Sequence, residues 1–208
     1  MEHETAAILT GDIVGSRQAG PEGVAAVFDA LAAALEDAAA WTGGPARLTR
    51  FRGDGWQALV PDGPRALRCA LFLRARLLTA ETAETRIAIG LGGISSAGTS
   101  DLSDADGAAF HASGAALDAM ARGRRLVLAA EGTPPLAPAV AELCDALARG
   151  WSLAQAEVVA PRLAPDAPSQ AALAERLGIR QQSVADRLEA AGLPAIEAAL
   201  EAVEAALA

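Results

Sequence analysis

Apolar and polar positions follow two different periods along the first 130 residues. Short apolar runs that alternate with polar residues are typical of strands, and longer stretches with apolar residues on one face are typical of helices. Segments rich in Gly and Pro separate these stretches. The predicted order is β-α-β-β-α-β and then α-β, over residues 5–12, 21–41, 47–60 for both strands of a hairpin, 63–78, 85–95, 108–120 and 124–130.

The hairpin decides the expected fold class. "RLTRFRGDGWQALV" (47–60) alternates on both sides of Gly53-Asp54-Gly55, so these glycines mark the tip of a β-hairpin. A hairpin between two strand-helix units predicts an α+β fold, with a ferredoxin-like sheet and helices on one face, rather than a doubly wound parallel sheet. A polar loop is expected over residues 95–107.

The pattern after "EGTPPLAP" (131–138) is helical only. Within residues 169–193, Ser169 is a suitable cap for a first helix and Gly178 for its end. A second helix follows with Val184 and Leu188 inward, which is the pattern of a helix-turn-helix. We therefore expect an α+β domain over residues 1–135 and a small all-α region over 136–208. The last helix has the pattern of a packing or dimer helix.

Composition narrows the function classes. The formal net charge is −9, so binding to nucleic acid by charge alone is not expected. Aromatic residues make up 3% of the chain, which predicts an aliphatic core. Cys69 and Cys144 occur in apolar helical patterns and are expected as buried free thiols. The N-terminus lacks the pattern of a signal peptide and no apolar run reaches membrane-spanning length, so a cytoplasmic protein is expected.

Two aspartates are the candidate metal ligands. Asp12 ends the first strand and Asp54 is at the tip of the hairpin. In a ferredoxin-like sheet these strands are neighbours, so the two carboxylates meet at one edge. Two carboxylates, a backbone carbonyl, waters and substrate phosphates together suit Mg²⁺. The alternative is that each Asp beside a Gly is ordinary turn chemistry, with a solvated carboxylate.

The residues after Asp12 suit a phosphate. In "TGDIVGSR" the amides of Val14, Gly15 and Ser16 are expected to approach a phosphate, and Gly15 gives room for close contact. Arg17 adds a positive charge. For Ser16, helix capping or phosphate contact is the preferred role, since a nucleophile needs an activating base nearby.

"LTGDIVGSR", "FRGDGWQALV", "RIAIGLGGIS" and "SDADGAAFHASGAAL" resemble the class III nucleotidyl-cyclase-like superfamily. With its helix-turn-helix, the whole chain is most similar to the SatD family of small bacterial proteins. The resemblance implies that Asp12 and Asp54 hold the metal together with the Ile13 carbonyl. It also implies that Arg50 and Asp104 select a purine, and that a homodimer forms, because cyclase sites lie between two subunits.

Three departures from the cyclase pattern concern catalysis. His111 and Ala115 stand where a cyclase has an Asn and an Arg that stabilise the transition state, and the chain has no Lys for the usual triphosphate contact. A missing guanidinium at such a transition state costs orders of magnitude in rate. His111 is a candidate general base or phosphate contact, and a partly buried, hydrogen-bonded His is the preferred alternative.

Three functions remain open. The first is a regulator, in which a degenerate cyclase-like domain binds a nucleotide or phosphate with Mg²⁺ and the helix-turn-helix contacts DNA or a partner. The second is an active metal-dependent nucleotidyl or phosphoryl transferase that uses Asp12 and Asp54. The third is a scaffold without a ligand. Base and phosphate contacts would come from the second helix of the helix-turn-helix, at Arg180, Gln181, Gln182, Ser183 and Arg187.

Overall fold

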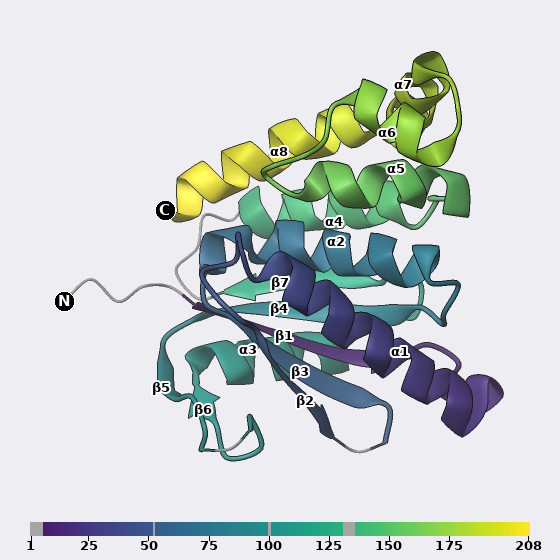
Figure 1. Cartoon of the computed structure of the whole chain (residues 1–208). Coiled ribbons are helices and arrows are strands. Elements are labelled where there is room, and N and C mark those ends of the chain that lie inside the picture. The colour runs from purple at the N-terminus through teal and green to yellow at the C-terminus, as the bar shows by residue number, and fades with distance from the viewer. Residues whose placement is uncertain (1–5, 52, 100, 131–135) are drawn as a thin grey trace.

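A computed structural model describes residues 6–51, 53–99, 101–130 and 136–208, with strands, helices and one 3₁₀ turn arranged as in Figure 1. The elements are β1 (Ala6–Ile13), α1 (Ser16–Ala38), β2 (Arg47–Phe51), β3 (Gly55–Val60), η1 (Gly63–Arg65), α2 (Ala66–Thr79), β4 (Thr85–Gly92), β5 (Ile94–Ser96), β6 (Asp106–Gly107), α3 (Ala108–Ala119), β7 (Leu126–Ala130), α4 (Leu136–Ala148), α5 (Leu153–Leu163), α6 (Gln170–Leu177), α7 (Gln181–Ala190) and α8 (Leu193–Leu207).

The main sheet has five strands in the order β2-β3-β1-β4-β7. The central strand β1 is antiparallel to both of its neighbours, β3 and β4, and β7 is parallel to β4. An α+β fold is therefore confirmed. β5 and β6 form a separate two-stranded sheet, so the segment expected to be only a polar loop contains two short strands.

The first helix begins earlier than its pattern predicts. α1 starts at Ser16, directly after the first strand, rather than at Pro21. Gly20 has non-helical torsion angles (φ 68°, ψ −179°) and Pro21 follows it, so the helix is kinked there. Proline in a helix interior removes a hydrogen bond and clashes with the preceding turn. The kink explains why the apolar periodicity becomes visible only after Pro21.

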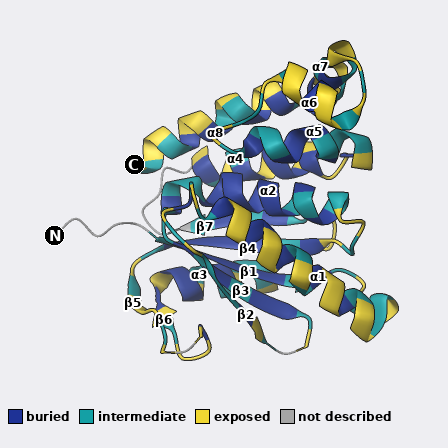
Figure 2. Ribbon diagram, in the orientation of Figure 1, coloured by how far each residue is buried: buried dark blue, intermediate teal, exposed yellow. Residues whose placement is uncertain are grey.

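Helices cover both faces of the sheet, so the expectation of helices on one face is wrong for α3. Side chains alternate along β1: Ala7 and Leu9 join the large core with α1 and α2, while Ile8 packs with Ala109 and Phe110 of α3. The large core is mainly aliphatic, with a few aromatic side chains such as Trp56, and the buried strands appear dark blue in Figure 2. Both cysteines are buried and free, as expected.

The C-terminal helices pack on the outer side of α2. α2 is buried between the sheet and this layer, and one continuous core includes residues from β1 to α8. Arg68 of α2 donates from Nε to Glu204 of α8 at 2.6 Å and from its Nη2 to the same carboxylate at 3.1 Å. The expected domain boundary between residues 135 and 136 lies in part outside the described residues. The segments before and after it share one core. No described helix is long and apolar enough to cross a membrane.

Candidate functional site

Asp12 and Asp54 lie at the same edge of the sheet. The β1–β3 register pairs Asp12 with Gly55, the residue directly after Asp54. One step further, the Ile13 N–H donates to the Asp54 carbonyl at 3.2 Å. The strand register thus holds the backbones of the two aspartates side by side.

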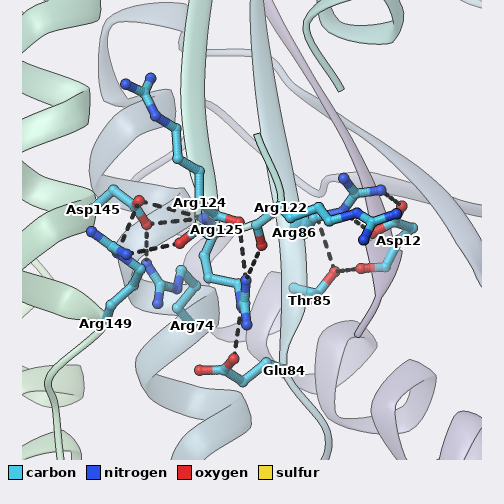
Figure 3. A network of polar contacts seen from close by, with 11 residues as sticks. Asp12, Arg74, Glu84, Thr85, Arg86, Arg122, Arg124, Arg125, Asp145 and Arg149 are labelled. Carbon is cyan, nitrogen blue, oxygen red and sulfur yellow. Dashed lines mark hydrogen bonds and ion pairs between the residues drawn. The ribbon is translucent and has the colours of Figure 1, made fainter. Parts of the chain in front are cut away.

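Arg86 of β4 binds Asp12 from the other side. Its Nε donates to Asp12 Oδ1 at 2.7 Å, and its Nη2 donates to Oδ2 (Figure 3). The β1–β4 register places these residues directly opposite each other. The hydrogen bonds to Asp12 raise the pKa of Arg86 above its usual value, and the charges of Asp118 and Asp54 add to this. The site therefore contains a resident cation that sequence reasoning did not identify.

A buried brace fixes the backbone at Asp12. The Trp56 indole N–H donates to Thr85 Oγ1 at 2.8 Å, and the Thr85 hydroxyl donates to the Asp12 carbonyl at 2.8 Å. Trp56 is fully buried. Gly11 is required beside it, because a Cβ there would lie 2.4 Å from Trp56 Cε2. The position of Asp12 is therefore set by the core and not by the turn alone.

The segment between β1 and α1 presents unpaired amides. Gly15 has left-handed torsion angles (φ 69°, ψ 26°) and caps α1 without a side-chain hydrogen bond. The N–H groups of Gly15, Ser16 and Arg17 donate to no group in the described part of the chain. Amides at a helix N-terminus are a general anion-binding arrangement.

Ser16 donates to Asp54 and does not cap the helix. The Ser16 Oγ–Asp54 Oδ2 distance is 2.5 Å. Val14, which precedes this turn, donates its N–H to the Glu84 carbonyl at 2.8 Å. The predicted phosphate segment Val14–Arg17 is thus anchored to Glu84, the residue before β4, and to the hairpin tip.

The donor set fits one class of metal site. No group of three or more His, Cys, Asp or Glu side chains that could hold a metal occurs among the described residues. Asp12 and Asp54 supply two carboxylates from neighbouring segments, which suits Mg²⁺ held partly by substrate phosphates and water, not a cage made of protein alone. Because Arg86 engages both oxygens of Asp12, a cation there competes with the guanidinium.

The turn between α3 and β7 lies at the same end of the sheet. This turn includes Arg125, whose carbonyl accepts a hydrogen bond from the Ile87 N–H at 2.8 Å. Ile87 directly follows Arg86 in β4. In this turn Arg124 pairs with Glu142, and Arg125 donates to Glu84 at 2.8 Å. The exposed side chains of Arg122 and Arg17 have no partner within the described ranges.

The predicted purine contacts do not come together. Arg50 donates from Nε to the Gly53 carbonyl at 2.7 Å, and its guanidinium lies 4.7 Å from the Phe28 ring centroid on the α1 face. Asp104 belongs to the loop on the opposite face, where it accepts from the Thr99 N–H at 3.0 Å. That loop is tied to the sheet by Leu102, whose N–H donates to Thr49 Oγ1. Arg50 and Asp104 therefore lie on opposite faces of the sheet.

His111 lies away from the aspartates. Its side chain is 78% exposed, so the expectation of a partly buried His is wrong, and its Nε2 lies 3.0 Å from Asp106 Oδ1. His111 is in the first turn of α3, whereas Asp118, near the end of that helix, acts on Arg86. Within one chain, α3 brings its C-terminal end and not His111 to the Asp12 edge.

The segment predicted as a helix-turn-helix consists of α6, a turn with Gly178 in left-handed conformation (φ 65°), and α7. The five predicted DNA contacts differ in availability. Arg180 and Gln181 are exposed, and Gln182 donates to Asp186 of the same helix at 2.8 Å. Arg187 is 3.2 Å from Glu157 of α5. Ser183 is half-buried. The available side chains are therefore Arg180 and Gln181.

Comparisons with known proteins give a likeness to solved structures only. No protein-family model matches the chain, and no curated protein matches it. Among solved structures, the crystal structure of the guanylyl cyclase Cya2 is similar, with a TM-score of 0.43 and 20% sequence identity, over 60% of this chain and 74% of that one. A likeness of this extent assigns neither activity nor ligand to the chain. Membership of the SatD family stays a prediction.

Proposed function

We propose that this chain binds the phosphates of a nucleotide, together with Mg²⁺, at the edge formed by Asp12 and Asp54. The observation that carries the proposal is the placement of Asp12 and Asp54 at one sheet edge, next to the turn that presents the unpaired amides of Gly15, Ser16 and Arg17. The strand order, with β1 antiparallel to β3 and β4, supports a ferredoxin-like, nucleotidyl-cyclase-like assignment of the sheet, which is part of the proposal.

Local charge favours an anion at this edge although the chain as a whole is acidic. The amides at the start of α1 carry the positive end of the helix dipole. Arg17 and Arg122 add guanidinium groups that have no partner within the described residues. Guanidinium groups bind phosphate oxygens through paired hydrogen bonds. The phosphate part of the ligand thus accounts for the recognition, and the base for little of it.

Mg²⁺ and Arg86 compete for Asp12. When bound, the cation would be held by the carboxylates of Asp12 and Asp54 and would neutralise phosphate charge. Arg86 would then leave Asp12 and become available to a phosphate, since its guanidinium has five donors and no acceptor. Binding of the cation and of the phosphates is therefore expected to be mutually dependent.

A thermal-shift experiment tests the proposal. ATP and GTP are added to wild type with and without Mg²⁺, and to the variants Asp12→Asn and Asp54→Asn. A ligand at 100 times its Kd adds roughly 2.7 kcal/mol of stability. We expect a shift for wild type that needs Mg²⁺ and is lost in both variants. Asp37→Asn is the matched control, because Asp37 is a half-exposed carboxylate in an ion pair on α1.

Two results would overturn the proposal. The first is the absence of any shift with either nucleotide in the presence of Mg²⁺. The second is a shift of equal size in wild type, Asp12→Asn and Asp54→Asn, which would place the ligand elsewhere. Each variant is compared with its own ligand-free melting curve, so a loss of basal stability does not imitate a loss of binding.

Turnover is a second candidate function. The observation that favours it is the guanidinium of Arg86 bound to Asp12, because a cation at this edge compensates in part for the Arg that Ala115 replaces. A metal-dependent nucleotidyl or phosphoryl transferase would convert the bound nucleotide. Incubation with ATP or GTP and Mg²⁺, followed by chromatography of the nucleotides, distinguishes conversion from binding alone.

For a binding protein without turnover, we infer a regulatory role in which α6 and α7 contact DNA or a partner protein. Arg180 and Gln181 are the exposed side chains that support such a contact. Fluorescence anisotropy with DNA from the region upstream of the gene, at several salt concentrations, tests it. Equal and weak binding to unrelated DNA would count against specific recognition.

A further inference from the structure

The large exposed hydrophobic residues of the described chain gather on one surface. Leu136, Leu143 and Leu147 of α4 are 70%, 66% and 44% exposed, and Leu153 at the start of α5 is 38% exposed. No other large hydrophobic side chain in the described ranges is exposed to this degree. Isolated exposed leucines need no explanation, but a contiguous apolar patch marks an interaction site.

The leucines form a stripe with half-buried Val140. Positions 136, 140, 143 and 147 are separated by four, three and four residues, so they lie on one side of α4. This spacing is the same when it is read in either direction. An isologous contact between two copies requires such self-complementarity, because residue i must meet residue j while j meets i. In an antiparallel pair of α4 helices, Leu136 meets the partner's Leu147 and Val140 meets the partner's Leu143.

Another side of α4 borders a groove beside the last strand of the sheet. This groove has a volume of about 490 Å³ and lies between the end of α3, β7 and α4, with Met120, Val127, Pro138 and Ala139 among its lining residues. β7 has a neighbour on one side only, so its other edge is unpaired in the main sheet. Exposed sheet edges are normally covered. The lining of the groove is mixed, with Arg124 and Glu142 beside its apolar side chains, so the groove adds contact surface of both kinds beyond the leucines.

The charges around the stripe permit contact with an identical surface. α4 has two acidic residues, Glu142 and Asp145. Asp145 is 2% exposed and is neutralised by Arg74 and Arg149, and Glu142 pairs with Arg124 of the same chain. Two copies that meet through α4 thus bring no uncompensated like charges together. A partner of strongly basic or acidic surface would find no complementary charge here.

We propose that this face of α4, together with the β7 groove, is the interface between two copies of this chain, with the two α4 helices antiparallel. The proposal rests on the stripe, the groove and the charges, and it is independent of the nucleotide site. A dimer formed through the opposite part of the sheet would leave α4 uncovered and is an alternative that the experiments distinguish.

Sedimentation equilibrium measures the self-association. Wild type is expected at about twice the 21.0 kDa mass of the chain. Leu143→Glu is expected to weaken the dimer at least about 100-fold, because it buries an unpaired charge at the centre of the contact. Leu136→Ser is a milder second variant, and Ala26→Glu on the exposed side of α1 is the control. Far-UV circular dichroism confirms that each variant is folded.

A monomeric wild type at high micromolar concentration would overturn the proposal. So would a wild-type dimer that is unaffected by both leucine variants, because that dimer would use another surface. A dimer that Ala26→Glu weakens as much as Leu143→Glu would also contradict it.

Cross-linking tests the direction of the helices. Leu136→Cys and Leu147→Cys are prepared separately and treated with a short thiol-specific cross-linker, alone and mixed. In the antiparallel pair, two copies of position 136 lie about 16 Å apart along the helices, so only the mixture cross-links. With parallel helices, each variant would cross-link on its own. The native Cys69 and Cys144 are buried and provide the unreacted background.

Discussion

Arg86 determines the chemistry available to Asp12. Its guanidinium holds both carboxylate oxygens, and both side chains are less than a third exposed. Without such a partner, two carboxylates at one sheet edge would repel each other and attract any cation. With it, the charge of Asp12 is balanced in the absence of ligand, and the guanidinium can be exchanged for a metal when phosphates supply further oxygen ligands.

Replacement of Arg86 separates its structural role from its competition with a metal. Arg86→Gln is expected to lower the free energy of unfolding by about 1–2 kcal/mol, because it removes a charge-assisted, two-point hydrogen bond. It is also expected to raise the affinity for Mg²⁺ in the absence of nucleotide. Urea denaturation measures the first effect and calorimetric titration with MgCl₂ the second.

Arg124→Gln is the matched control for Arg86→Gln. The Arg124–Glu142 pair is more exposed, and pairs of this kind contribute about 0–1 kcal/mol. This variant should leave Mg²⁺ binding unchanged. If Arg86→Gln bound Mg²⁺ no better than wild type, Asp12 would not be the position where guanidinium and cation compete.

At the scale of elements, α3 depends on one glycine of β4. A Cβ at Gly90 would lie 2.1 Å from the Ala109 carbonyl oxygen and 2.6 Å from the Ser113 nitrogen. α3 is therefore in backbone contact with the strand, and the buried Thr10–Ser113 hydroxyl pair, 2.7 Å apart, fixes its register. The same packing directs the C-terminal end of α3 to the Asp12 edge.

Gly90→Ala is expected to destabilise the protein by about 1–3 kcal/mol, because the added methyl group must displace the backbone of α3. Gly93→Ala is the control, since nothing lies within 4 Å of a Cβ at that position. Thermal unfolding followed by circular dichroism measures both. Equal melting temperatures for the two variants would show that α3 does not pack on β4 as described.

The alternation of side chains between the two faces of a strand explains which site residues were predictable from the sequence. The pairing of Asp12 with Asp54 followed from the order of strands, and the register confirms their common edge. The purine pair failed to meet because neighbouring residues of a strand point to opposite faces: Thr49 holds the loop of Asp104 on one face, and Arg50 lies over Phe28 on the other. A sequence pattern gives alternation, but it does not tell which face receives a later helix or loop.

At the scale of the whole molecule, the periodicity of the sequence predicted the order of the elements. It did not predict the contacts between elements that are distant in the sequence. Arg86 became a site residue only through the pairing of β1 with β4, over a separation of 74 residues from Asp12. Arg68 and Glu204 are 136 residues apart. Such contacts depend on which surfaces meet after the sheet has formed, and a single sequence has no local signal for them.

The shared core predicts that the chain unfolds as one unit. Burial raises the pKa of Cys69 in α2 to about 12 and that of Cys144 in α4 to about 11. At pH 8 both thiols are therefore protonated and unreactive in the folded protein. Unfolding returns the pKa to about 8.5 and creates thiolate. A thiol-specific reagent then reports the exposure of each cysteine separately in Cys69→Ala and Cys144→Ala.

Both single-cysteine proteins are expected to react in the same urea transition in which the circular dichroism signal is lost, after correction for the stability of each variant. α2 is buried between the sheet and the C-terminal helices, which share one core. We therefore expect the sheet and the C-terminal helices to unfold together. If Cys144 instead reacted at a urea concentration that leaves Cys69 protected, the C-terminal helices would open as a separate unit. The division near residue 135 would then be a true domain boundary.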